Sequence, residues 1–398
     1  MQIALITLHT PTPANCRGAS ALPYHLLAFR PKDVHVEVWS FNLNGCTPED
    51  IRYTESTLAL TIHLVDKPQW FGLLAPAAVR LLLPRPMLSY LRLPDAARRE
   101  ISAYLRPSGS ALWIYGEDIA HLSRNFPSVP AVVTTPDCEA MYYHRLLSMQ
   151  GIPLSKLSLA RYTLMYHRYA TMAARYPSGS STTYHLVGQQ DALFLKRLNP
   201  GAKTVFIPHP HYDVTPHAHK EVSSGEPIRL LIAGRYDLTM AQAVDEAIDA
   251  MMSLPSQTIK KYKVTFLGKG WDQCCTSLRS AGFDTVVKGF VEDYAAEVTS
   301  HHIQLTPITV GTGTKGKVLD AFANGLMVIG TPLALENIAV AYGLECACYT
   351  DGLQLAQWLS RLADNPAMIN SIARAGNAAV LREHSRQSVA RTFFHLFE

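Results

Sequence analysis

The sequence predicts an α/β protein made of two doubly wound domains, each with a parallel sheet covered by helices. Three observations support this fold class. Short apolar runs alternate with helical segments along the chain, which is typical of parallel strands joined by crossover helices. Many of these runs are continuously apolar, as strands buried on both faces require. The chain has 398 residues, of which 48% are hydrophobic and 17% charged, so it is globular and long enough for two cores.

The expected strands form two series. The first series comprises residues 3–8, 34–39, 111–115, 131–135, 183–187 and 204–207. The second series comprises residues 228–233, 263–267, 284–287, 303–306 and 327–330.

The two series are separated by a segment that cannot form a regular element. Residues 208–227 hold four prolines, four histidines and a Ser-Ser-Gly run, which favours a linker. We therefore expect an N-terminal domain over 1–207, a linker over 208–227 and a C-terminal domain over 228–398. The last helix is expected to be able to pack back on the N-terminal domain.

Charge, cysteine content and hydropathy exclude several classes of protein. A net charge of +4 is too small to indicate nucleic-acid binding. The seven cysteines are odd in number and form no CxxC pair, which favours reduced thiols over a disulfide framework or a zinc site. The N-terminus reads as a strand rather than a signal peptide, and no stretch could span a bilayer without charge or proline. We expect a cytoplasmic protein.

The most informative segment is a glycine-rich loop that opens a short helix. Gly311 and Gly313 let backbone N–H groups approach a phosphate, and the helix N-terminus adds a partial positive charge. Lys315 and Lys317 supply cations at the same end. Asp320 lies one turn further on the same helix face, where a carboxylate can accept hydrogen bonds from ribose hydroxyls. The segment therefore predicts a nucleotide site, and the alternative is a surface turn that caps an ordinary helix.

Three other residues are candidates for a ligand site. Arg235 follows a strand end and Gly234, where a guanidinium suits a diphosphate; the alternative is a solvated loop arginine. Asp137 precedes a helical run and is either its N-cap or a carboxylate that orients an acceptor or acts as a base. Gly18, in the loop after the first strand, is either part of a phosphate cradle or an ordinary loop glycine.

The linker histidines permit a metal interpretation because imidazole is a common ligand. Between His209 and His219, which also enclose His211 and His217, the only carboxylate or cysteine is Asp213. A polar hinge is the preferred interpretation, and no metal site is predicted.

A long window without acidic residues extends from Glu139 to Asp191. Arginines and tyrosines recur in it every seven residues, nearly two helical turns, so each set lines one stripe. These residues are Arg161, Arg168 and Arg175, and Tyr162, Tyr169 and Tyr176. The pattern indicates either a solvated arginine stripe beside a packed tyrosine stripe or a cationic surface for an anionic partner. Together with the acid-free residues 70–92, the second interpretation indicates lipid headgroups or a lipid-diphosphate acceptor.

The second half of the chain resembles the donor-binding domain of group 1 (family 4) glycosyltransferases, which have the two-domain GT-B architecture. The match begins at Ala-Gly-Arg (233–235) and continues through Phe-Leu-Gly-Lys-Gly (266–270) and Val-Lys-Gly-Phe-Val-Glu-Asp (287–293). It is most specific at Gly-Thr-Gly-Thr-Lys-Gly-Lys-Val-Leu-Asp-Ala (311–321). The first half is similar only in scattered pieces.

The resemblance implies two Rossmann-like domains facing an interdomain cleft. It also implies retaining, metal-independent hexosyl transfer from a UDP- or GDP-linked sugar to a glycan, lipid-linked or protein acceptor, with no further cofactor. The implied catalytic residues are Asp137, Arg235 and Lys315. The implied donor-binding residues are Gly18, Gly234, Phe290, Val291, Thr312, Gly313, Thr314, Lys317 and Asp320. Peripheral contact at the inner membrane face is a further expectation, and nucleic acid is not an expected partner.

Three departures from the family pattern keep two alternatives open. The first is in the usual pair of glutamates: Thr312 stands where members often have one that contacts the donor sugar, and Asp320 is shorter than the second. Another is Pro-His-Pro (208–210) in place of the usual Pro-Asn-Gly before the linker. Residues 236–239 lack the lysine that often follows Gly-Arg. The alternatives are a catalytically inactive GT-B-like binding subunit of a glycosyltransferase complex and a nucleotide-sugar epimerase.

Overall fold

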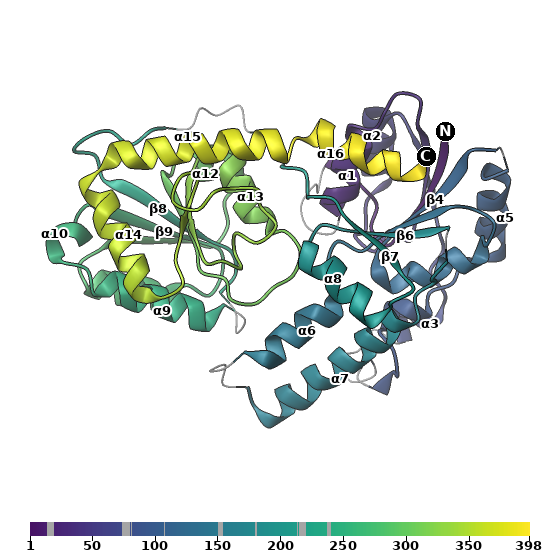
Figure 1. Cartoon of the computed structure of the whole chain (residues 1–398), viewed down its shortest axis with the longest axis horizontal. Helices are drawn as coiled ribbons and strands as arrows, with labels where there is room; N and C mark the ends of the chain where they lie inside the picture. The colour runs from purple at the N-terminus through teal and green to yellow at the C-terminus, as the bar shows by residue number, and fades with distance from the viewer. Residues whose placement is uncertain are drawn as a thin grey trace. The chain divides into compact units, whose positions relative to one another are not determined.

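The computed structural model describes residues 1–13, 20–73, 80, 82–106, 108–149, 154–179, 181–212, 214, 220–236 and 240–398. The chain divides into two compact units (Figure 1). Unit 1 is built on Met1–Ser148, Leu154–Pro210 and Arg386–Glu398, and unit 2 is built on His211–Ser385. The change of unit falls between Pro210 and His211, inside the segment 208–227 that the sequence assigns to a linker.

Unit 1 contains a seven-stranded parallel sheet in the order β3-β2-β1-β4-β5-β6-β7. The strands are β1 (Gln2–Thr7), β2 (His35–Ser40), β3 (Thr61–Leu64), β4 (Ser110–Tyr115), β5 (Ala131–Thr134), β6 (Thr182–Leu186) and β7 (Lys203–Phe206). The α-helices are α1 (Ala21–Ala28), α2 (Pro48–Leu58), α3 (Trp70–Leu73), α5 (Asp95–Tyr104), α6 (Glu139–Ser148), α7 (Lys156–Ala174), α8 (Gln189–Leu198) and α16 (Arg386–Phe394). The 3₁₀ helices are η3 (Met87–Tyr90), η4 (Glu117–Asn125) and η5 (His395–Phe397).

Both faces of this sheet are buried because alternate residues of a strand point to opposite faces. Ile3 and Leu5 of β1 belong to an apolar cluster with α1 and α16. Ala4 and Ile6 belong to a second cluster with α5, η4, α6 and α8. This two-sided burial explains why most strands of unit 1 read as continuous apolar runs.

The last helix of the chain is part of unit 1. Phe393 is fully buried, and its ring lies 4.8 Å from that of Trp113 on β4 and 4.9 Å from that of His185 on β6. α16 therefore covers the central strands on the α1 face of the sheet.

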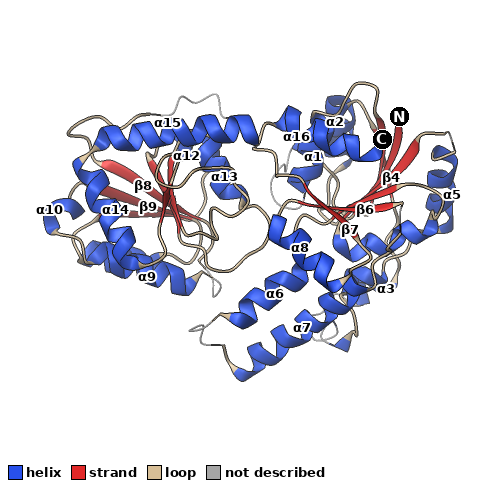
Figure 2. Cartoon of the chain, viewed as in Figure 1, coloured by secondary structure: helices blue, strands red, loops and turns tan. Residues whose placement is uncertain are grey.

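Unit 2 contains a six-stranded parallel sheet in the order β10-β9-β8-β11-β12-β13. The strands are β8 (Ile228–Ala233), β9 (Tyr262–Leu267), β10 (Asp284–Lys288), β11 (Ile303–Thr306), β12 (Met327–Gly330) and β13 (Ala347–Cys348). The helices are α9 (Ala241–Met252), α10 (Ser256–Ile259), α11 (Asp272–Ser280), α12 (Tyr294–Thr299), α13 (Gly316–Ala323), α14 (Gly352–Asp364) and α15 (Pro366–Glu383). Figure 2 shows helices on both sides of the strands in each unit.

The core of unit 2 follows the same alternation. Leu230 and Ile232 of β8 pack with α9, α11 and α14, whereas Leu231 and Ala233 pack with α12 and α13. α15 contributes to both clusters. The two doubly wound parallel sheets confirm the predicted fold class.

Every strand expected from the sequence corresponds to a strand of the structure, but β3 and β13 were not predicted. β3 has the sequence Thr-Ile-His-Leu with only Ile62 buried, so this edge strand lacks an apolar run. β13 has only two residues, which is too short to give a pattern. The cysteines that the structure describes form no disulfide.

Candidate active site

The strand order of unit 2 reverses between β8 and β11. In open parallel sheets, ligands bind at the carboxyl ends of the strands at such a switch point. β8 ends at Ala233, so Gly234 and Arg235 emerge there, and β11 leads into the glycine-rich loop that opens α13. The topology thus brings together two segments that the sequence singled out and that lie about 80 residues apart.

Gly234 fits this position because L side chains rarely adopt its backbone conformation and because a side chain there would displace the ammonium of Lys317. Its φ is +128°, and an added Cβ would lie 2.7 Å from Nζ of Lys317. The backbone is held on both sides: its N–H donates to the carbonyl of Leu267 (2.8 Å), and its carbonyl accepts from the indole N–H of Trp271 (2.8 Å). The turn after β8 is therefore a fixed element of the site.

Lys317 brings a positive charge to the carboxyl end of β8. Its Nζ donates to the carbonyl oxygen of Ala233 (3.1 Å), although the lysine itself belongs to the first turn of α13. Arg235, two residues after Ala233, is exposed. Two cations and the N-terminus of a helix thus meet at one end of the sheet, which favours an anionic ligand.

Lys315 closes the glycine-rich loop on itself. This residue is the N-cap of α13, but its ammonium turns back to the carbonyl oxygens of Thr312 (2.9 Å) and Gly313 (3.0 Å). Asn337 also donates to the carbonyl of Gly313 (2.9 Å). The ammonium of Lys315 is thus held by carbonyl oxygens of its own loop. The predicted catalytic role of Lys315 remains a prediction.

The start of α13 also excludes a side chain. A Cβ added to Gly316 would collide with the hydroxyl of Tyr212. Thr314, the residue before Lys315, is half-buried.

Asp320 lies within α13 and is 1% exposed. Its Oδ1 accepts from the side-chain amide of Asn324 (3.2 Å), which also donates to its backbone carbonyl (2.9 Å). Asn324, at the C-terminal end of the same helix, thus orients the carboxylate. Contact with a ribose remains a prediction.

Phe290 and Val291 follow β10, the strand at the far edge of the sheet. Phe290 is 84% exposed, whereas Val291 packs against the apolar cluster that includes Leu231 and Val318. Only the phenylalanine ring is therefore available to stack on a base. This role is also still a prediction.

Asp137 and Gly18 are the predicted site residues of the first half. Asp137 is half-buried just after β5. The N–H groups at the start of α6 donate to carboxylates from other elements: Cys138 to Asp191 (2.9 Å) and Glu139 to Glu117 (3.3 Å). Two distant acids therefore satisfy the orphan donors of this helix. Gly18 lies outside the described residues.

An acidic cluster in unit 1 escaped the sequence analysis. Glu117 and Asp118 follow β4, where the strand order of unit 1 reverses between β1 and β4. Burial, together with Glu139 and Asp118, raises the pKa of Glu117 well above its usual range. Burial raises the pKa of Asp118 to about 7 and, with the charge of Asp137, that of Glu139 to about 7. An acidic pair directly after a strand and Gly116, whose φ is +122°, is the signal that could have revealed it.

Two of the linker histidines are described. Nδ1 of His209 lies 2.7 Å from the carbonyl oxygen of Pro210, and both His209 and His211 are buried. Asp213, His217 and His219 lie outside the described residues. Across the described ranges, no group of three histidine, cysteine or carboxylate side chains is arranged to hold a metal ion. Within the same ranges, no helix is both long and apolar enough to cross a bilayer.

Comparisons with known proteins agree with this architecture. Residues 247–395 match the model of a family described as glycosyl transferase-like. No curated protein sequence matches the chain.

Several solved structures share the fold over nearly the whole chain. Anabaena HepE in complex with UDP superposes with a TM-score of 0.62 at 12% identity, covering 99% of both chains. Sucrose-phosphate synthase from Thermosynechococcus elongatus gives 0.62 at 13% identity, covering 100% of this chain and 98% of the other. WaaG, a glycosyltransferase involved in lipopolysaccharide biosynthesis, gives 0.59 at 13% identity, covering 100% and 99%. The chain therefore has the GT-B fold, with two Rossmann-like α/β domains.

Proposed function

We propose that this protein is a glycosyltransferase that moves a hexosyl group from a UDP- or GDP-linked sugar to an acceptor. The observation that carries the proposal is the meeting of Lys317, Arg235 and the N-terminus of α13 at the switch point of unit 2. The match of residues 247–395 to a glycosyl transferase-like family supports it. HepE structures with UDP and with UDP-glucose make UDP the first nucleotide to test.

In the proposed reaction, the C–O bond between the sugar and the diphosphate breaks and the nucleoside diphosphate leaves with its electron pair. The acceptor hydroxyl forms the new C–O bond to the same anomeric carbon and gives its proton to the departing diphosphate. The backbone of Gly313 and Thr314 and the cations of Arg235, Lys315 and Lys317 would neutralise the developing charge. This form of electrostatic stabilisation is often the largest catalytic contribution. Because side chains and backbone N–H groups supply the positive charge, the reaction needs no metal ion.

The same match to the family pattern assigns the other proposed donor contacts. Asp320 would hold the ribose, and Phe290 with Val291 would flank the base. Thr312 would lie toward the donor sugar. In unit 1, Asp137 and the loop of Gly18 would orient the acceptor, which is a glycan, a lipid-linked sugar or a protein.

We include retention of anomeric configuration, a cytoplasmic location and peripheral contact with the inner membrane face in the proposal. The support for membrane contact is an exposed face of α7 that carries leucine and arginine side chains.

Nucleotide binding tests the proposal directly. UDP or GDP is expected to raise the melting temperature of the wild-type protein. Lys317→Met should weaken that affinity by roughly 10- to 100-fold, because a hydrogen bond to a charged group contributes about 1.5–3 kcal/mol. Lys263→Met is the matched control, since Lys263 pairs with Asp284 near the amino ends of β9 and β10. No shift with either nucleotide at millimolar concentration would refute the donor site.

A binding subunit without catalysis is the second candidate function. Two observations favour it: Lys315 is engaged with carbonyl oxygens of its own loop, and Thr312 provides no carboxylate. Release of free UDP from UDP-glucose only when an acceptor is added would exclude this candidate and an epimerase together. Binding of nucleotide without such release under a broad acceptor screen would favour it.

A further inference from the structure

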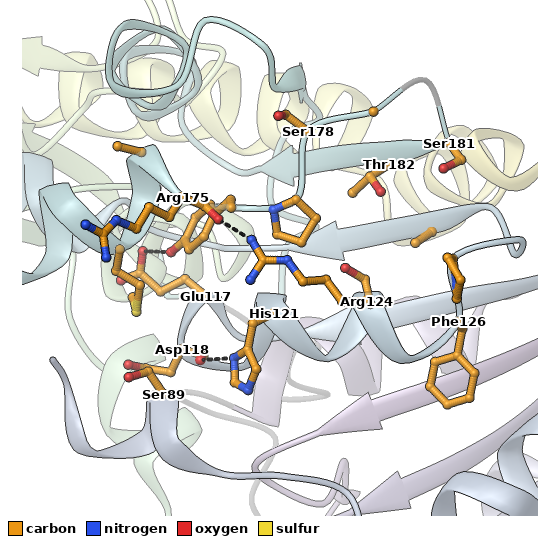
Figure 3. A pocket seen from close by; sticks show the side chains of 18 of the residues that line it. Ser89, Glu117, Asp118, His121, Arg124, Phe126, Arg175, Ser178, Ser181 and Thr182 are labelled. Carbon is orange, nitrogen blue, oxygen red and sulfur yellow. Dashed lines mark hydrogen bonds between the residues drawn. The ribbon is translucent and has the colours of Figure 1, made fainter.

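Unit 1 contains a pocket of about 770 Å³ that the proposed function does not use (Figure 3). η4 forms one wall, the end of α7 with Arg175 and Tyr176 forms another, and residues 177–179 close the third. The pocket runs from Glu117, after the carboxyl end of β4, to Ala131 and Thr182, the first residues of β5 and β6. Ligands of doubly wound sheets bind at carboxyl ends, so a pocket that reaches the amino ends requires its own explanation. All its lining residues belong to unit 1.

One end of the pocket is lined by carboxyl groups. Glu117 is buried and accepts a hydrogen bond from the hydroxyl of Tyr176 (3.0 Å). Oδ1 of Asp118 is shielded from solvent and has no hydrogen-bond partner in the described part of the chain. Buried polar atoms in native proteins are nearly always paired. The structure thus places two carboxyl groups at this end of the pocket, one of them paired with a hydroxyl of the protein.

The side chain of Arg124 lies in the middle of the pocket. Arg124 donates to the carbonyl oxygen of Arg175 (2.6 Å), and Figure 3 shows its side chain lying between the Glu117 end and the Thr182 end. Both arginines are exposed. Arg85 also lines the pocket, and its guanidinium lies 4.5 Å from the ring centroid of Tyr90. The lining of the pocket thus includes three arginines and two acidic residues.

The charge balance favours an anion. Burial raises the pKa of Asp118 to about 7, and that of Glu117 lies well above its usual range. At neutral pH the acidic end therefore carries less than its full charge, whereas arginine stays protonated. Carboxyl groups near their pKa can also both donate and accept hydrogen bonds, which suits hydroxyl groups as partners.

The remaining lining residues match a carbohydrate. Hydroxyl side chains line the far end, and apolar side chains provide surface for C–H groups. These residues are Ser123, Ser178, Ser181, Thr182, Phe126 and Met172.

We propose that this pocket binds a small anionic saccharide, whose hydroxyl groups contact Glu117 and Asp118 and whose phosphate or carboxylate contacts Arg124 and Arg175. A sugar phosphate and a carboxylated sugar share this chemistry. The inference does not rest on the proposed transferase activity, because no donor-site residue of unit 2 lines the pocket.

Calorimetric titration of the full-length protein tests this inference. Glucose 6-phosphate and glucuronate are the anionic probes, with neutral glucose and inorganic phosphate as references. We expect at least one anionic sugar to bind about tenfold or more tightly than either reference. Equal binding of inorganic phosphate would overturn the proposal, as would the absence of binding by both sugars.

Two variants locate the binding. Arg124→Gln should abolish the preference for the anionic sugar over glucose. Asp118→Asn should weaken the binding of the anionic sugar severalfold. Arg98→Gln is the matched control, because Arg98 pairs with Asp95 on α5 and does not line the pocket. Binding that survives both pocket variants unchanged would overturn the assignment.

A last comparison distinguishes two sources of such a ligand, a free metabolite and part of a glycan. Tighter binding of free glucose 6-phosphate indicates a metabolite, and tighter binding of a glucuronate-terminated disaccharide indicates part of a glycan. UDP binding should be the same in Arg124→Gln as in the wild type. Failure of the saccharide site and failure of the donor site are therefore distinguishable.

Discussion

Asp118 shows how the fold changes the chemistry of a single carboxyl group. Burial raises its pKa from 3.8 to about 7. Between these two values the folded protein holds a proton that the unfolded chain has already released. The contribution of Asp118 to the free energy of unfolding therefore falls as the pH rises from about 4 to about 7.

Asp118→Asn removes this dependence. Between pH 4 and pH 8, the free energy of unfolding of the variant should rise by roughly 2 kcal/mol relative to that of the wild type. This is about half of what the full pKa shift would give, because the side chain is partly exposed. Urea denaturation at the two pH values measures the difference. If the stabilities of the wild type and the variant change by the same amount between the two pH values, the raised pKa of Asp118 is contradicted.

Asp50 is a control of opposite sign. Hydrogen bonds from the backbone N–H and hydroxyl of Thr47 lower its pKa below 3.8. Its contribution is present above pH 3.8 and is lost as the pH falls through the lower folded value. Asp50→Asn should therefore destabilise the protein at neutral pH and have less effect in acid.

The individual residues of the candidate site were only partly predictable from the sequence. Gly234, Arg235 and Lys317 could be assigned to one donor site because the resemblance to group 1 glycosyltransferases implies all three, and the structure brings them together at the switch point of unit 2. The engagement of Lys315 with Thr312 and Gly313 could not, because a lysine in a loop has many rotamers and only the folded loop selects one. Glu117 was missed because its burial depends on Tyr176 and Glu139, which come from other elements.

Helix α7 illustrates the same limit for whole elements. The seven-residue spacing predicted an arginine stripe, but only Arg161 and Arg175 are exposed; Arg168 is buried and donates to the carbonyl of Arg80 (3.3 Å). The tyrosine stripe does pack: the ring of Tyr169 lies 5.8 Å from that of Tyr143 on α6. Periodicity gives a shared face, but the neighbouring chain decides which part of that face stays exposed.

The exposed face of α7 also carries leucines. Leu157 is 82% exposed and Leu164 is 38% exposed, with Arg161 on the same helix. An exposed surface that combines leucine with arginine and lacks acids is typical of helices that lie on anionic lipid surfaces. This surface supports the peripheral membrane contact in the proposed function.

Vesicle sedimentation tests this contact. The wild-type protein should bind vesicles that contain anionic phospholipid more than neutral ones. Replacing both Leu157 and Leu164 by serine should reduce that binding roughly tenfold, since each leucine buried in the interface contributes on the order of 1 kcal/mol or more. Leu353→Ser, an exposed leucine of α14 in unit 2, is the matched control. Equal loss in the control, or none in the double variant, would contradict a role for α7.

Strands were predictable where burial is two-sided. β1 and β8 are almost entirely buried and their apolar runs marked them in the sequence. β3 shows why an edge strand escaped prediction: it has one neighbouring strand, only Ile62 is buried, and Thr61 and Leu64 are exposed. The missing strands are therefore those for which the hydrophobic signal is physically absent.

At the scale of the whole molecule, the two units have separate apolar cores. The clusters on the two faces of each sheet draw their residues from the same unit, including α16 in unit 1. Both sheets share the order of a doubly wound fold, with the reversal between their first and fourth strands. A ligand bound only by residues of unit 2 should therefore stabilise that unit selectively.

Hydrogen exchange measured by mass spectrometry checks this selectivity. With UDP at about one hundred times its dissociation constant, binding should contribute roughly 2.7 kcal/mol to the stability of the unit that binds it. Core amides of β8, β11 and α13 should exchange up to about a hundredfold more slowly, while those of β1 and β4 stay unchanged. Lys317→Met at the same UDP concentration should remove most of the protection. Equal slowing in β1 and β4 would show that the two units open together, because exchange from a jointly unfolding core would carry the full stabilisation to both sheets.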